Sequence, residues 1–185
     1  MKKLILIMAA FGAIMTSCGE KKQVDNPLLA EWDTPFQIPP FESIKTEHFM
    51  PAYVEAMAQH KAEIDSIVNN PEAPTFENTI VAYDNSGELL DRVSAVFGSV
   101  SGVASSPEVL ALAKELSPLT SKHSSEIELN EGLFKRIKAV YEKRDSLKLD
   151  AEQMRLLTET YKDFVRNGAD LPIDKKEELK KIDEE

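Results

Sequence analysis

The helical character of this chain is clearest in residues 69–92, NNPEAPTFENTIVAYDNSGELLDR. Pro71 and Pro74 flank a rigid turn, and Thr75 can cap the helix that follows. Apolar residues then recur at three- and four-residue spacing, at Phe76, Ile80, Tyr83, Leu90, Val93, Phe97 and Val100. This spacing predicts one continuous, one-sided helix from the cap to about Ala104, roughly 45 Å long.

Glycines within this predicted helix need a separate explanation. We expect Gly87 to mark a bend or a close contact with another helix rather than a break. The run Gly98–Gly102 lacks the following Lys-Ser/Thr that a phosphate-binding loop requires. Its small residues are instead expected to allow close approach of another helix.

Further helices are predicted on both sides of this stretch. The first should run from about Glu47 or Met50 to Val68, before the Asn-Asn-Pro stop at residues 69–71. Ser106, followed by proline, and Asn130 are expected to cap two later helices. The positions predicted to be buried in these helices are Tyr53, Met57, Ile64, Ile67, Leu112, Leu116, Leu119, Ile127, Phe134, Ile137 and Tyr141.

The last third of the chain continues the pattern. Asp150 with Gln153 should form a capping box, followed by a buried stripe of Met154, Leu157, Tyr161 and Phe164. Gly168 is expected as a left-handed C-terminal cap, and Asp174 with Glu177 should open a last helix. That helix reaches Glu185 with three acids in its last four positions, so we expect a truncated chain. No alternating strand pattern occurs, and the chain is predicted to be all-α, with an antiparallel helical bundle in residues 46–185.

Whole-chain composition limits the classes of function. A length of 185 residues with 42% hydrophobic content suits one domain, or a piece of a larger one, with a real core. The single cysteine rules out an internal disulfide. A net charge of −10 argues against a nucleic-acid partner, because a phosphate backbone binds basic surfaces.

The amino terminus has the pattern of a bacterial lipoprotein signal. Lys2 and Lys3 form a positive region, residues 4–14 are an apolar run short for a bilayer span, and small residues precede Cys18. We expect residues 1–17 to be a signal peptide and Cys18 to be lipidated, giving an exported, membrane-anchored protein facing the periplasm or the cell exterior. Residues 18–45 would then be a lipid tether followed by a proline-rich extended segment, with Trp32 as its anchor. An ordinary cleaved signal is the alternative.

Several segments together resemble one family of peptidases. Residues 69–92 are similar to the amino-terminal region of the peptidyl-dipeptidase (dipeptidyl carboxypeptidase) and oligopeptidase A branch of the thimet oligopeptidase family of zinc metallopeptidases. The other matching pieces are Phe49–Ala52, Ala62–Ile67, Leu129–Ile137, Leu149–Leu157 and Phe164–Leu171. The resemblance implies the helical, amino-terminal part of a larger fold.

The chemistry of that family requires residues that this chain does not contain. The resemblance implies zinc bound by a His-Glu-x-x-His helix and a further Glu, all carboxy-terminal to the matched region. The 185 residues hold no such motif, and none of His48, His60 and His123 has a second histidine four positions away. No catalytic or zinc residue can therefore be assigned here, and we expect the chain alone to be inactive.

Two His-x-x-Glu pairs suggest a different metal site. His60 with Glu63 and His123 with Glu126 could together supply four ligands between helices. Both histidines, however, fall within apolar stripes, so we favour hydrogen-bonded, partly buried structural histidines. Serines such as Ser99 are plentiful but lack a Gly-x-Ser-x-Gly elbow, which argues against a serine hydrolase.

Three functional hypotheses follow. The resemblance implies an exported peptidyl-dipeptidase that releases dipeptides from the carboxyl ends of oligopeptides, with this region shaping substrate access. The alternative is a complete, non-enzymatic, membrane-tethered helical lipoprotein that binds a peptide or an envelope protein. A helical metal-binding lipoprotein using the two His-x-x-Glu pairs is a third option.

Overall fold

The computed structural model describes residues 26–103 and 105–184. The long helices are α1 (Thr46–Val68), α3 (Glu88–Val103), α4 (Pro107–Glu128), α5 (Glu131–Tyr141), α6 (Ala151–Arg166) and α7 (Ile173–Glu184). The shorter elements are the 3-10 turns η1 (Pro35–Gln37) and η3 (Arg144–Ser146), the π-helical η2 (Phe76–Val81) and α2 (Ala82–Asp84). The described residues contain no strand, which confirms the all-α prediction.

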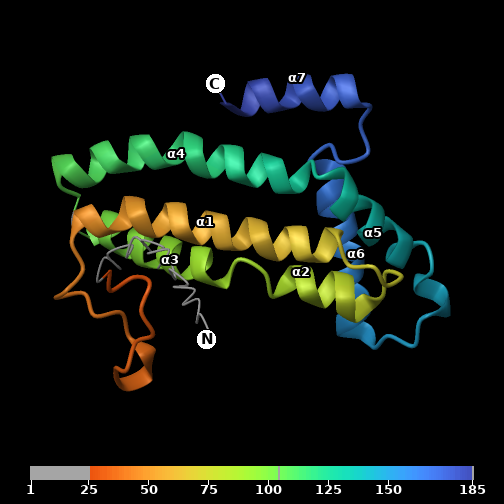
Figure 1. The fold of residues 1–185 in the computed structure, drawn as a ribbon, viewed down its shortest axis with the longest axis horizontal. Coiled ribbons are helices and arrows are strands. Elements are labelled where there is room, and N and C mark those ends of the chain that lie inside the picture. Colours follow the sequence, from red (N-terminus) through yellow and green to blue (C-terminus); the bar gives the residue numbers. More distant parts are fainter. Residues whose placement is uncertain (1–25, 104, 185) are drawn as a thin grey trace, which may run out of the picture.

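The helices form an elongated bundle (Figure 1). α1 packs against α3 on one side and against α4 on the other, and α3 runs antiparallel to α1. α5 and α6 lie together at one end, across the direction of the long helices, and α7 runs back along α4. No helix of the described residues is both long enough and apolar enough to cross a bilayer.

Most of the predicted helix ends are confirmed. Ser106 accepts a hydrogen bond from the Val109 amide, and Asn130 accepts one from Leu133. Asp150 and Gln153 form the reciprocal capping box. Gly168, at φ +91°, ends α6 in a Schellman motif whose amides bond to the carbonyls of Val165 and Phe164.

The cap predicted for the last helix is wrong. α7 begins at Ile173, so Asp174 lies inside its first turn instead of before it. The first helical bond goes from the Lys176 amide to the carbonyl of Pro172, whose ring fixes φ, and the helix therefore starts two residues earlier than it would after a capping Asp174.

The single long helix predicted from Thr75 is also wrong. Thr75 caps η2 as expected, but α2 ends after Asp84 and α3 starts only at Glu88 (Figure 1). Gly87 adopts φ +80°, a left-handed conformation that a continuous helix cannot contain. Its predicted close contact is confirmed, because a Cβ here would lie 3.0 Å from His60 Cε1.

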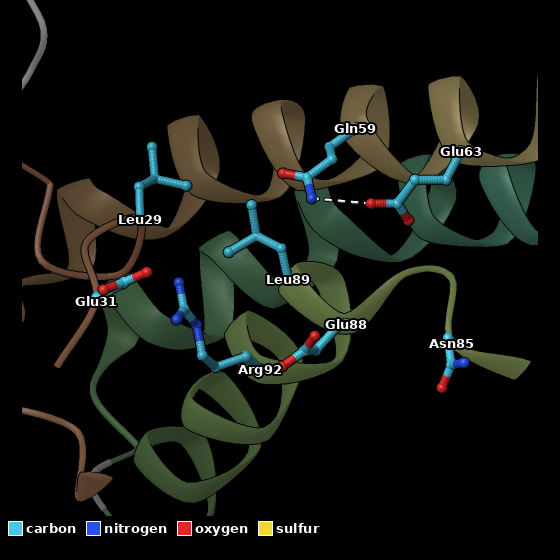
Figure 2. Close-up of a pocket in the computed structure, with 8 residues that line it drawn as sticks. All are labelled: Leu29, Glu31, Gln59, Glu63, Asn85, Glu88, Leu89 and Arg92. Atoms are coloured by element: carbon cyan, nitrogen blue, oxygen red, sulfur yellow. Dashed lines mark hydrogen bonds between the residues drawn. The ribbon is translucent and has the colours of Figure 1, made fainter. Parts of the chain in front are cut away.

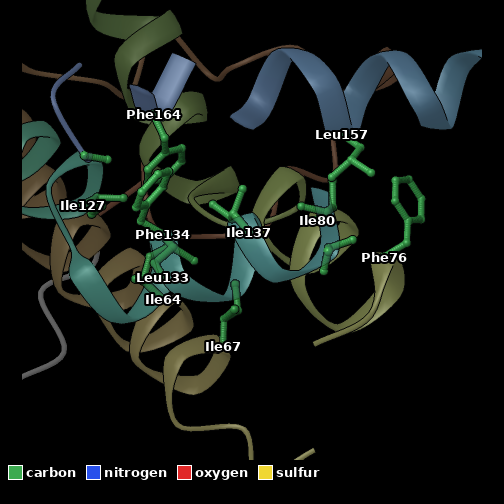
Figure 3. Packing of buried hydrophobic residues seen from close by; sticks show 12 residues of the cluster. Ile64, Ile67, Phe76, Ile80, Ile127, Leu133, Phe134, Ile137, Leu157 and Phe164 are labelled. Atoms are coloured by element: carbon green, nitrogen blue, oxygen red, sulfur yellow. The ribbon is translucent and has the colours of Figure 1, made fainter. Parts of the chain in front are cut away.

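The buried side chains form two separate cores. The carboxy-terminal core (Figure 3) is built from the end of α1, η2, α5 and α6, with Ile64, Ile67, Phe76, Ile80, Ile127, Leu133, Phe134, Ile137, Val140, Leu157, Phe164 and Ala169. The amino-terminal core lies between the start of α1, α3 and α4, with Leu28, Phe49, Ala52, Tyr53, Ala56, Val93, Val96, Leu112 and Leu116. Most of the residues predicted to be buried belong to, or pack against, one of these cores.

A layer of polar residues separates the two cores. α1 contributes to the amino-terminal core up to Ala56 and to the carboxy-terminal core from Ile64 onward. α4 changes from one core to the other between Leu116 and Ile127, and the chain breaks between α2 and α3 at the same level. We call the residues at this level, His60, Glu63, Ser86, Gly87 and His123, the polar layer.

The segment before α1 is irregular apart from η1, as expected for residues rich in proline. Trp32 anchors it, since its indole nitrogen donates to the Pro27 carbonyl at 2.7 Å and its ring lies under the Arg92 guanidinium, 4.9 Å from the centroid. Asn26 is buried and bonds to the His48 carbonyl at 2.8 Å. These contacts fold the segment back onto the amino-terminal core.

Two predictions about packing are wrong at the surface. Leu119, placed in a buried stripe, is 40% exposed. Gly98 and Gly102 have open space where a Cβ would stand, so no helix of the described residues approaches them closely.

Candidate functional site

The first feature of the polar layer is Glu63 on α1, whose carboxylate caps the start of α3. Glu63 Oε2, on α1, accepts the Gly87 amide at 2.8 Å, and its Oε1 accepts from Gln59 Nε2 at 2.9 Å. The Gly87 amide lies at the start of α3, where a negative charge is favourable. Glu63 therefore stabilises the backbone at the break between α2 and α3.

Two histidines meet beside this cap. His123 Nε2, on α4, lies 3.1 Å from His60 Nδ1, on α1, with the ring centroids 5.1 Å apart. His60 Nε2 lies 3.3 Å from Ser86 Oγ, and Ser86 donates its proton to the Tyr83 carbonyl at 2.6 Å. The chain of contacts joins α1, α4 and the residues just before α3.

The Ser86 hydroxyl determines where the imidazole protons lie. Its one proton goes to Tyr83, so Oγ must accept from His60 Nε2. Neutral His60 then has a lone pair on Nδ1, and His123 Nε2 must donate to it. Both neutral imidazoles thus carry their proton on Nε2.

Burial disfavours a positive charge on either ring. Desolvation lowers the pKa of His60 below its ordinary value, against the opposing charges of Glu63 and Asp91. Desolvation and the neighbouring His60 also lower the pKa of His123, while Glu126 acts in the opposite direction. At neutral pH the pair is uncharged.

An open pocket of about 280 Å³ lies next to the polar layer (Figure 2). Its charged lining residues are Glu63 on α1, Glu88 and Arg92 on α3, and Glu31 on the amino-terminal segment, toward which Arg92 extends. Arg92 Nη2 donates to the Leu28 carbonyl at 3.1 Å. The lining offers carboxylate, guanidinium and amide groups but no histidine, cysteine or serine.

The proposed four-ligand metal site does not assemble. The two histidines do meet, but Glu63 is engaged by Gly87 and Gln59. No group of three or more His, Cys, Asp or Glu side chains in the described residues could hold a metal. The hydrogen-bonded, partly buried histidines that we favoured are confirmed.

Other candidate residues have local roles or lie outside the structure. Ser99 and Ser101 each donate to a carbonyl three or four residues earlier, as helical serines commonly do, and Ser105, just after α3, donates to the Ser101 carbonyl. Cys18, the predicted lipidation site, lies outside the described residues.

Sequence reasoning missed two residues that organise this region. Ser86 determines the tautomer of the two neutral histidines, and the residues beside it in the sequence do not indicate that role. Arg136 is buried and donates to the carbonyls of Asn70 and Glu72 and to Asn78 Oδ1, which holds the 70–78 loop. Its position between Leu133 and Ile137 on a buried helix face was the available signal.

Comparison with known proteins gives a consistent answer. The chain is 40% identical over 160 residues to dipeptidyl carboxypeptidase of Salmonella typhimurium and 39% identical to that of Escherichia coli. It is 27% identical over 157 residues to oligopeptidase A of Salmonella typhimurium. These alignments cover 85–86% of the chain but only 22–24% of each relative, so the chain spans about a quarter of their length. No model of a known protein family matches the chain.

Proposed function

Because this chain belongs to the thimet-like peptidase family of dipeptidyl carboxypeptidase and oligopeptidase A, we propose that it is the amino-terminal helical part of a peptidyl-dipeptidase. The observation that carries the proposal is the identity of 40% to dipeptidyl carboxypeptidase, against 27% to oligopeptidase A over a similar length. The whole protein would release dipeptides from the carboxyl ends of oligopeptides.

In this proposal the helices control access and other residues break the bond. The arrangement of α1, α3 and α4 side by side suits one wall of a substrate channel (Figure 1). The described residues do not fit the zinc ion that the family resemblance implies, because they offer no cluster of three ligands. Zinc would be held by a part of the protein outside this chain.

The mode of cleavage can be tested with the native protein from its own cells. We expect an oligopeptide with a free carboxyl terminus to lose successive dipeptides, detected by mass spectrometry, and the same peptide ending in an amide to resist. Equal cleavage of both peptides at internal bonds would overturn dipeptide release. The 185-residue chain, assayed beside the native protein, is expected to be inactive.

We further propose that the protein is exported and anchored through lipid on Cys18. The proposal rests on the charged, apolar and small-residue order of residues 2–18. Intact mass of the membrane-bound protein should equal a chain starting at Cys18 plus acyl groups, and Cys18→Ala should move the protein to the soluble exported fraction. An unmodified mature chain in the membrane fraction would contradict it.

The same mass measurement separates the enzyme from the alternative. A native species several-fold heavier than 20.7 kDa is expected for a peptidase of the relatives' length. A species matching residues 18–185 plus acyl groups would overturn the peptidase proposal and leave a tethered, non-enzymatic helical protein.

A further inference from the structure

We propose that the His60–His123 pair is an acid-sensitive latch, which holds the two cores together when it carries no more than one proton and releases them when it carries two. The inference rests on the geometry of the polar layer and is independent of the proposed peptidase function. Three elements meet at this pair: α1 through His60, α4 through His123 and the α2–α3 break through Ser86.

Counting protons explains why the latch has a threshold. In the neutral pair, His123 donates to Nδ1 of His60 and keeps a lone pair on its own Nδ1. A first proton can bind there without disturbing the bond between the rings, and it makes that bond charge-assisted. A second proton must occupy His60 Nδ1, which places two N–H groups and two positive charges face to face across 3.1 Å. The bond between the rings is then lost.

The surrounding charges modulate this threshold without removing it. Glu63 on α1 and Asp91 on α3 favour a proton on His60, and Glu126 on α4 favours one on His123. α7 also packs on α4, and its buried cation Lys176 is paired with Glu131 at 3.5 Å. Burial outweighs the carboxylates at both rings, since the net effect is a lowered pKa for each.

The position of the pair gives its titration a mechanical consequence. The polar layer is where α1 and α4 each pass from one core to the other. Gly87 is the left-handed residue at the break, and a Cβ there would touch His60. Separation of the rings would therefore free the residues of the α2–α3 break before it disturbs either core.

The sign of the pH effect follows from the lowered pKa values. In an open layer the histidines take up protons near their ordinary pKa of about 6.5, whereas the closed layer resists them. Stability of the layer is thus fully present above about pH 6.5 and falls as the pH drops toward the pKa values of the closed pair. Each extra proton bound by the open layer raises the opening equilibrium about tenfold per pH unit.

Hydrogen exchange of the native full-length protein tests the latch. Mass spectrometry at about pH 7.5 and about pH 5, corrected for the intrinsic rate, should show protection of residues 82–91 falling by about tenfold or more at the lower pH. Protection of α6, within the carboxy-terminal core, should stay unchanged and serves as the internal reference. An equal loss over the whole protein, or no loss at residues 82–91, would overturn the proposal.

Matched substitutions identify the residues responsible. The double variant His60→Asn with His123→Gln keeps an acceptor and a donor near the original positions but cannot be protonated, so its residues 82–91 should show no pH-dependent loss. His48→Asn removes a histidine that caps α1 outside the layer and should behave as the wild type does. A pH-dependent loss that persists in the double variant would overturn the latch, and the wild-type measurement stands even if that variant fails to fold.

Discussion

The two cores differ in the range of the hydrogen bonds that hold the surrounding elements: these bonds are mostly local at the carboxy-terminal core and long-range at the amino-terminal core. Around the carboxy-terminal core, Asn130 and Asp150 cap the starts of α5 and α6 through bonds to residues three positions away, and Gly168 ends α6 in a local Schellman turn. The amino-terminal core is instead closed by bonds between distant residues, such as Asn26 to His48 and Arg92 to Leu28, 64 positions apart. Its helices also carry exposed apolar side chains, including Val103 at 91%.

This difference predicts unequal behaviour of the two ends. Local caps form as soon as their helix forms, whereas a bond between distant residues requires the whole fold. Arg136 adds long-range bonds to the 70–78 loop, but the carboxy-terminal core also has stacked aromatic rings, with Tyr141 and Tyr161 3.9 Å apart. We therefore expect the amino-terminal core to open first, with the polar layer as the boundary.

The largest expected effect comes from removing an aromatic ring from the amino-terminal core. Phe49 is buried and meets Phe97 edge to face at 5.1 Å, so Phe49→Ala should cost about 3–5 kcal/mol of unfolding free energy. Hydrogen exchange should rise in α3 and the start of α1 but much less in α6. The matched variant Leu133→Ala should show the opposite distribution, and equal effects everywhere from both variants would mean a single cooperative unit.

A smaller effect is expected at the boundary itself. Gly87→Ala forces a side chain into a left-handed conformation and against the His60 ring, and should cost at least about 1–2 kcal/mol in urea unfolding. Because Gly87 lies between the cores, the loss of protection should centre on residues 82–91. An unchanged urea midpoint in Gly87→Ala would show that residue 87 is not held in the left-handed conformation against His60.

A local cap gives the next smaller effect. Asp150→Ala removes the oxygen that accepts the Gln153 amide and should cost about 1 kcal/mol, with faster exchange confined to the first turn of α6. Asp150→Asn keeps a capping oxygen and should leave urea stability nearly unchanged. Loss of stability in the Asn variant equal to that in the Ala variant would assign the effect to charge rather than to the cap.

The smallest effect has the opposite sign. Gly98 lies within α3 with open space where a Cβ would stand, so Gly98→Ala should raise the unfolding free energy by roughly 0.5–1 kcal/mol. Gly87 and Gly98, both within the originally predicted helix, are thus expected to respond in opposite directions to substitution by alanine. If Gly98→Ala were destabilising, α3 would have to contact something at Gly98 that lies outside the described residues.

Local chemistry was sufficient to predict a large part of the fold. The helical class, the ends of α1, the caps at Thr75, Ser106, Asn130 and Asp150, and the turn at Gly168 all depend on residues within a few positions of one another. Similarity along the chain likewise identified the family before any geometry was known, and the comparisons confirm it.

The break at Gly87 and the pairing of the two histidines required the assembled fold. The amide of Gly87 is satisfied by Glu63, 24 positions away, and His60 meets His123 across 63 positions. Apolar spacing continues across the break, because the same face is buried on both sides of it, so periodicity alone predicts one helix. The observed structure has two helices instead, because the Glu63 carboxylate on α1 accepts the Gly87 amide at the start of the second one. Only tertiary packing brings this carboxylate within reach of the amide.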